Sequence, residues 1–112
     1  MSSPKSAAAY LLVATTCNDR GVLVRIAEHL VDERLAACVQ ISGPVQSVYR
    51  WEGKIETAEE WLLQAKTRAG LWEAIVRAIR KLHPYEVPEL IATPLAEIDR
   101  DYERWMDEAL RS

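Results

Sequence analysis

The sequence predicts an α+β domain of the ferredoxin-like, split βαβ class, with a four-stranded antiparallel sheet, a long hairpin and an extra C-terminal helix. Strand-like and helical patterns alternate in the order strand, helix, strand, strand, helix, strand, and a third helical stripe follows. The chain has 112 residues, of which 49% are hydrophobic, and this size suits one core. We therefore expect a single domain over residues 10–112, preceded by a flexible tail over residues 1–9.

The first strand and the first helix have the clearest patterns. Residues 10–15 are mostly apolar at consecutive positions, so both faces of this strand should be covered. Asn18 or Asp19 can cap the helix that follows, and His29 should face solvent. The helix repeats apolar residues at intervals of three and four, which predicts one buried stripe: Leu23, Ile26, Ala27, Leu30 and Val31.

The next two strands should form the long hairpin. Residues 36–41 are typical of a strand, and alternation resumes over residues 45–51 after Gly43 and Pro44, where a bulge or bend would interrupt one long strand. Gly53 can adopt a positive φ in a tight turn. The returning arm should begin at residues 54–56, have room to widen just beyond them, and continue as the third strand over residues 61–66.

A second helix, a short strand and a third helix complete the domain. The second helix follows Gly70, and its apolar positions are Leu71, Trp72, Ile75, Val76, Ile79 and Leu82. Residues 90–93 predict a short buried strand that Pro94 ends. Asp99 can cap the last helix, whose apolar positions are Tyr102, Trp105, Met106, Ala109 and Leu110.

The predicted sheet carries too many apolar residues for a monomer. In the ferredoxin-like arrangement both helices pack on one face of the sheet and leave the other face bare. The first strand, however, is apolar on both sides, and the third strand has Leu63 on one face and Leu62 on the other. Because a bare face of this kind is a large exposed apolar patch, we expect a homo-oligomer.

Composition and charge argue against several classes of function. The net charge of −3 argues against nucleic acid as a partner, and no run approaches the roughly 20 apolar residues that cross a membrane. Residues 1–9 lack the apolar centre of a secretory signal, so a cytoplasmic protein is expected. Cys17 and Cys38 are too few for a disulfide framework, and free thiols are expected.

Neither an organic cofactor nor catalysis is expected. The glycines form no phosphate-binding loop. A pairing of Cys38 with His83, or of Glu86 with Glu89, lacks the third orienting group that nucleophilic or acid–base catalysis needs.

The proline-rich segment over residues 83–89 is the strongest candidate for a site. Pro84 and Pro88 each fix φ and remove an N–H donor, so the segment can neither continue a helix nor lie inside a sheet. A stiff connector of this kind holds four side chains in a nearly fixed relation: His83, Tyr85, Glu86 and Glu89. The alternative is an ordinary connector whose histidine caps or packs and whose glutamates are solvated.

Three blocks of the chain resemble the CutA divalent-cation-tolerance family in order and in spacing. They are ERLAACV over residues 33–39, SVYRWEGKIE over residues 47–56 and HPYEVPE over residues 83–89, with Tyr102 and Trp105 beyond. The resemblance implies a tight homotrimer similar to the PII signalling proteins, with long hairpins that pair between subunits. It also implies a role in tolerance to copper and other divalent ions.

Only part of the metal site implied by the resemblance has matching ligands in this sequence. Where members have proposed copper ligands, the matching positions here are Thr15, Leu82 and His83, and of these only the histidine is a ligand type that copper favours. Within one chain the candidate ligands are Cys17, Cys38, His83 and either Glu86 or Glu89. Of these we expect the metal ligands to be His83, Cys38 and Glu86, which two subunits can bring together at one cleft. Cys38 has a second interpretation as a small core residue.

The resulting hypothesis is a non-catalytic trimer that binds copper or another divalent cation weakly at clefts between subunits. The alternative is a ligand-sensing or scaffolding trimer whose cleft takes a small anion or a partner peptide, with Lys66 supplying the charge. The cleft residues would be Tyr49, Trp51, Lys66, Tyr85 and Glu89, although Tyr49 and Trp51 also suit plain interface packing.

Overall fold

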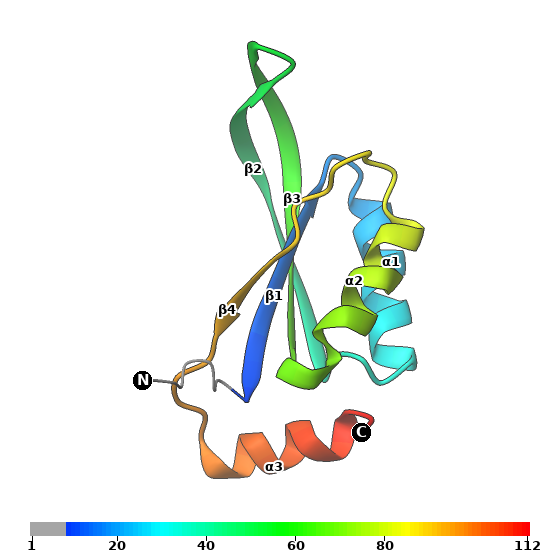
Figure 1. The fold of residues 1–112 in the computed structure, drawn as a ribbon, viewed down its shortest axis with the longest axis vertical. Helices are drawn as coiled ribbons and strands as arrows, with labels where there is room; N and C mark the ends of the chain where they lie inside the picture. The colour runs from blue at the N-terminus through cyan, green and yellow to red at the C-terminus, as the bar shows by residue number, and fades with distance from the viewer. Residues whose placement is uncertain (1–8) are drawn as a thin grey trace.

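A four-stranded antiparallel sheet carries two helices on one face in the computed structural model, which describes residues 9–112 (Figure 1). The strands lie in the order β2-β3-β1-β4, which confirms the predicted ferredoxin-like class. The elements are β1 (Tyr10–Cys17), α1 (Arg20–Asp32), β2 (Cys38–Trp51), β3 (Lys54–Arg68), a 3-10 turn (Ala69–Leu71), α2 (Trp72–Leu82), β4 (Ile91–Pro94) and α3 (Arg100–Ala109). The predicted tail lies outside the described residues except for Ala9.

The core lies between the sheet and helices α1 and α2. Val13 and Leu63, on the face of the sheet that the helices cover, are fully buried together with Leu23, Ile26, Leu30, Ile75 and Ile79 from the helices. Asp19 caps α1 as expected, accepting a hydrogen bond from the Gly21 N–H. No helix among residues 9–112 is long and apolar enough to cross a membrane.

Four residues of the predicted helical stripes are exposed, namely Val31, Leu82, Tyr102 and Trp105. Val31 was expected in the core but is 46% exposed, because Val22 rather than Val31 lies on the buried side of α1. At 100° per residue, Val31 is rotated well away from the direction shared by Leu23 and Ile26. Leu82 is 41% exposed because it is the last residue of α2, where the chain leaves the helix.

The hairpin of β2 and β3 is longer and more regular than the pattern indicated. The two strands pair from Cys38 with Lys66 to Trp51 with Lys54, and the register shifts between Ser42 and Val45, around Gly43 and Pro44 where a bulge was predicted. The returning arm does not widen, because residues 57–59 pair in register with β2. In Figure 1 the hairpin extends past the ends of α1 and α2, away from α3.

Strand β4 and helix α3 lie at the margins of the sheet. The prediction of a buried fourth strand is wrong for the single chain, since all four residues of β4 are exposed and Ile91 is 54% exposed. The reason is that β4 is an edge strand that pairs only with β1. Helix α3 begins after the predicted cap Asp99 and crosses one end of the sheet, burying Met106 and Leu110 but leaving Trp105 exposed (Figure 1).

The sheet has an open face, which is the face opposite α1 and α2. In the single chain nothing among residues 9–112 packs over it as a helix. The register places side chains there from all four strands, including Leu12, Ala14, Cys38, Leu62, Lys66 and Ile91. The hairpin continues this face with Val45, Ser47, Tyr49 and Trp51 opposite Glu60, Ala58, Glu56 and Lys54. The open face therefore changes from apolar near β1 to aromatic and acidic along the hairpin.

Candidate functional site

A cleft of about 690 Å³ lies on the open face, between the hairpin and the connector from α2 to β4. Its lining combines rings, carboxylates and small polar groups from β1, both hairpin strands and the connector. The lining includes Tyr49, Trp51, Glu60, Tyr85, Glu86, Val87, Pro88 and Glu89. Within the described part of the chain, the lining includes no Lys, Arg or His side chain.

His83 fixes the start of the connector through its ring nitrogens. Its side chain is only 7% exposed, and both ring nitrogens have backbone partners. The Tyr85 N–H donates to Nδ1 at 3.1 Å, so Nδ1 accepts, and Nε2 carries the hydrogen and donates to the Thr16 carbonyl at 2.7 Å. His83 was predicted as a metal ligand, but in the single chain both of its ring nitrogens bond backbone groups and hold the connector against the end of β1.

Tyr85 joins three elements at the floor of the cleft. Its hydroxyl donates to Glu60 Oε2 at 2.7 Å and accepts from the Asn18 N–H at 2.9 Å. Burial, followed by the hydrogen bond to the Glu60 carboxylate, raises the pKa of Tyr85 above its ordinary value. The phenol therefore stays protonated at neutral pH and acts as a donor toward Glu60.

Glu60 is the candidate site residue that sequence reasoning missed. Its side chain is 6% exposed and lines the cleft, and among residues 9–112 it forms no ion pair. The sequence offers Glu59 and Glu60 side by side in an alternating segment. Only the register, which sets Glu60 opposite Val45 on the open face, separates the buried carboxylate from its solvated neighbour.

The structure places the predicted site residues in two groups. Tyr49, Trp51, Tyr85, Glu86 and Glu89 line the cleft. Cys38 and Lys66 instead pair with each other, and Lys66 also pairs with Leu12. Because Leu12 precedes Thr16 by four residues, Cys38 and Lys66 lie about 13 Å along β1 from the carbonyl that binds His83.

Lys66 is engaged at its own end of the sheet. Its Nζ donates to the Tyr102 hydroxyl at 3.3 Å and lies 5.4 Å from the centre of the Tyr102 ring. The positive charge that was expected to attract an anion into the cleft is therefore directed toward α3. The cleft itself is acidic.

The residues implied by the resemblance do not form a copper site within one chain. Thr15 is fully buried, with its hydroxyl unpartnered among the described residues, and the Leu82 side chain cannot ligate. Burial raises the pKa of the Cys17 thiol, which favours the protonated form over the thiolate that copper prefers. Over residues 9–112, no three His, Cys, Asp or Glu side chains are close enough together to hold a metal ion.

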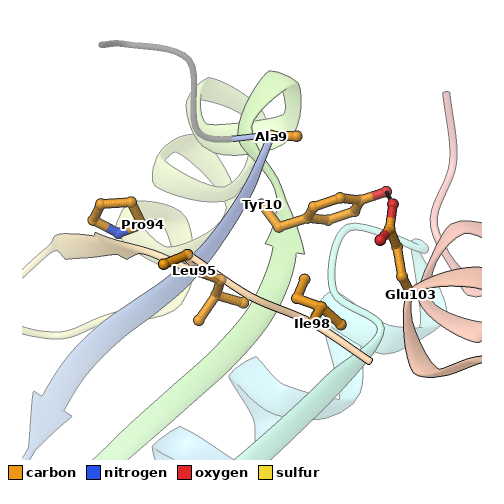
Figure 2. A pocket seen from close by; sticks show the side chains of 7 residues that line it. Ala9, Tyr10, Pro94, Leu95, Ile98 and Glu103 are labelled. Carbon is orange, nitrogen blue, oxygen red and sulfur yellow. Dashed lines mark hydrogen bonds between the residues drawn. The ribbon is translucent and has the colours of Figure 1, made fainter. Parts of the chain in front are cut away.

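A second, smaller hollow of about 270 Å³ lies between the start of β1 and the chain that leads into α3. Figure 2 shows the Tyr10 ring extending from β1 toward Glu103 of α3. The Tyr10 hydroxyl bonds Asp107 Oδ1 at 2.7 Å and Glu103 Oε2 at 3.2 Å, and these partners help raise the pKa of Tyr10 to about 12. None of the predicted site residues lines this hollow.

Comparisons with known proteins connect the chain to one family. The family model described as CutA1 divalent ion tolerance protein matches residues 11–109. The chain is 41% identical over 97 residues to the divalent-cation tolerance protein CutA of Thermus thermophilus, covering 87% of this chain and 94% of that protein. It is 39% identical to Protein CutA of Mus musculus, where the match spans 87% of this chain but only 55% of the mouse protein.

Solved structures agree with the sequence matches. The crystal structure of CutA1 from Shewanella sp. SIB1 superposes with a TM-score of 0.89 at 40% identity, covering 93% of this chain and 97% of that chain. The Thermus thermophilus structure superposes with a TM-score of 0.88 at 39% identity, covering 91% and 99%.

Proposed function

The chain belongs to the CutA1 divalent ion tolerance family, and on this premise we propose that it acts in tolerance to divalent cations as a non-catalytic protein. It binds such ions weakly in the acidic cleft on its open face. Copper is one candidate ion, and the cleft carboxylates are the proposed anchors.

The observation that supports this proposal is the environment of Glu60. A carboxylate that is 6% exposed loses much of its hydration, and a neutral phenol supplies only a hydrogen bond in return. Buried charges are normally paired with an opposite charge or bound to a metal ion. A bound cation would supply that partner, so the cleft favours cations over anions.

The donor atoms that line the cleft suggest weak and unselective binding. Glu60, Glu86 and Glu89 supply carboxylate oxygens, while Ser47 and Thr16 supply further oxygen atoms. Oxygen donors suit Mg²⁺, Ca²⁺ and Mn²⁺ better than Cu(I), which prefers sulfur. Because no three acidic, His or Cys groups converge among residues 9–112, an ion would complete its shell with water or with groups from another copy.

We also propose that the protein is a homotrimer with the cleft at the seams between copies. The support is the open face, where Leu12 and Leu62 are only half-buried in the single chain and Ile91 is exposed. Strands β2 and β4 are both edges of the sheet, so another copy can pair with either.

Calorimetric titration tests the cation site directly. Cu²⁺, Zn²⁺ and Mn²⁺ are added separately to wild type, to Glu60→Gln and to the control Glu97→Gln, whose exposed carboxylate lies outside the cleft. Loss of the Glu60 charge should weaken binding about tenfold or more, which corresponds to about 1.4 kcal/mol. The control should bind as wild type does, and equal affinity of wild type and Glu60→Gln for every ion would refute the proposal.

A ligand-sensing or scaffolding trimer is the second candidate. The aromatic lining of the cleft favours it, because Tyr49 and Trp51 offer area that a bare ion does not use. On this alternative a small organic molecule raises the melting temperature while divalent ions leave it unchanged.

A further inference from the structure

We propose that the cleft binds an aliphatic polyamine, a chain of methylene groups that carries two or more ammonium groups. This inference rests on the proposed role of the cleft as a cation site, and it names the class of organic cation that the cleft accepts. Three properties of the cleft support it: its size and length, the sign of its charge, and its rings.

The cleft has room for a ligand much larger than a single ion. Its volume of about 690 Å³ lies within the roughly 300–1,000 Å³ of small-molecule sites, whereas one water occupies about 30 Å³. Along β2 the cleft runs from the level of Val45, opposite Glu60, to Trp51. Six residues of extended strand span about 20 Å, so a linear ligand matches the shape.

The charges in the cleft are all of one sign. Glu60, Glu86 and Glu89 line it, and within the described residues it has no basic side chain. Only Oε2 of Glu60 has a hydrogen-bond partner among residues 9–112, so Oε1 is left to accept one. An ammonium group has three donors and no acceptor, and it therefore complements this carboxylate.

The rings and the apolar connector residues favour an organic cation over a metal ion. In the single chain Tyr49 and Trp51 are 44% and 41% exposed, and the exposed Val87 adds apolar surface in the same lining. An ammonium group is attracted to the face of an aromatic ring, and methylene groups gain by leaving water. A hydrated metal ion gains little from either kind of surface.

Titration with a matched pair of ligands tests the proposal. Putrescine has four methylene groups between two ammonium groups, and 1,4-butanediol has the same carbon chain without charge. Binding to the full chain is followed by calorimetry and by melting temperature, at constant ionic strength because simple attraction to an acidic protein is screened by salt. Putrescine should bind and raise the melting temperature, and butanediol should do neither.

Variants locate the binding. Glu60→Gln keeps the shape of the side chain and an acceptor for Tyr85, and it should weaken putrescine binding about tenfold or more, while Glu97→Gln should not change it. If Glu60→Gln does not fold, Glu86→Gln replaces it, because Glu86 is exposed and forms no ion pair among residues 9–112. Equal binding of putrescine and butanediol, or unchanged putrescine affinity in the cleft variant, would overturn the proposal.

The same samples separate this inference from the proposed function. If divalent ions bind through Glu60 and putrescine does not bind, the polyamine assignment is wrong and the cation-tolerance proposal stands. If putrescine binds through Glu60 and no divalent ion does, the assignment stands and the proposed function falls. If neither binds, both are wrong.

Discussion

His83 acts as a bridge between two backbone segments, one at the end of β1 and one in the connector. Both of its ring nitrogens are used, and the ring also meets the Tyr85 ring edge-on, with centroids 4.6 Å apart. Tyr85 in turn orients the Glu60 carboxylate. The histidine therefore affects the cleft through position and needs no contact with the ligand.

This role predicts a loss of stability when His83 is removed. In His83→Ala the Thr16 carbonyl and the Tyr85 N–H lose their partners, and each unsatisfied buried group costs about 1–3 kcal/mol. Unfolding by denaturant should therefore show a loss of at least about 2 kcal/mol. The control is His29→Ala, whose exposed side chain should change stability by less than about 0.5 kcal/mol.

Unchanged stability in His83→Ala, combined with a loss of metal binding, would contradict the bridging role of His83. If His83→Ala keeps the wild-type stability but no longer binds copper in the calorimeter, the imidazole is a ligand rather than a bridge.

At the residue scale, the sequence predicted the position of the candidate site but not the surroundings of Glu60 and Lys66. The stiffness of the connector follows from Pro84 and Pro88 alone, so the pattern indicated where the site lies. The importance of Glu60 depends on a register that only the folded hairpin fixes, and the engagement of Lys66 with Tyr102 depends on where α3 docks. No local pattern carries either fact.

At the scale of elements, α3 is held by the short segment between α1 and β2. Arg34 donates from Nε to the Ala109 carbonyl at 3.1 Å and from its terminal nitrogen to the Glu108 carbonyl, so it caps the end of α3. Its own carbonyl accepts from the Arg111 N–H at 2.9 Å. Arg34 achieves this with φ of 59°, a conformation that costs a residue with a side chain about 1–2 kcal/mol.

Two substitutions separate the cap from the backbone strain. Arg34→Ala loses the cap and keeps the strain, whereas Arg34→Gly loses the cap and relieves the strain. The glycine variant should therefore be more stable than the alanine variant by about 1 kcal/mol, as measured by denaturant unfolding. Both should be less stable than wild type, and an alanine variant as stable as the glycine variant would contradict this account of α3.

The elements with strong periodicity were predicted well, and the marginal ones were not. The caps at Asp19 and Asp99 and the long hairpin are local features that the sequence specifies directly. The exposure of β4 is different, because an apolar run indicates burial but cannot say that a strand lies at an edge. The apolar residues of β4 therefore suit burial against another copy rather than burial within the single chain.

At the scale of the whole molecule, the proposals share one physical basis. The single chain measures 43 × 36 × 23 Å and extends a hairpin whose Val48 and Ile55 are 63% and 62% exposed, while much of its apolar open face also remains accessible. Exposed apolar surface of this extent marks an interface in soluble proteins. Identical copies must therefore cover the open face and complete the cleft.

The molar mass of the purified protein in solution, measured by light scattering over a range of dilutions, tests this requirement most directly. We predict about 38 kDa, three times the 12.7 kDa of one chain, down to low micromolar concentration. A mass near 12.7 kDa at every concentration would contradict the account, because the apolar face would then be stable in water and the cleft would belong to one copy alone.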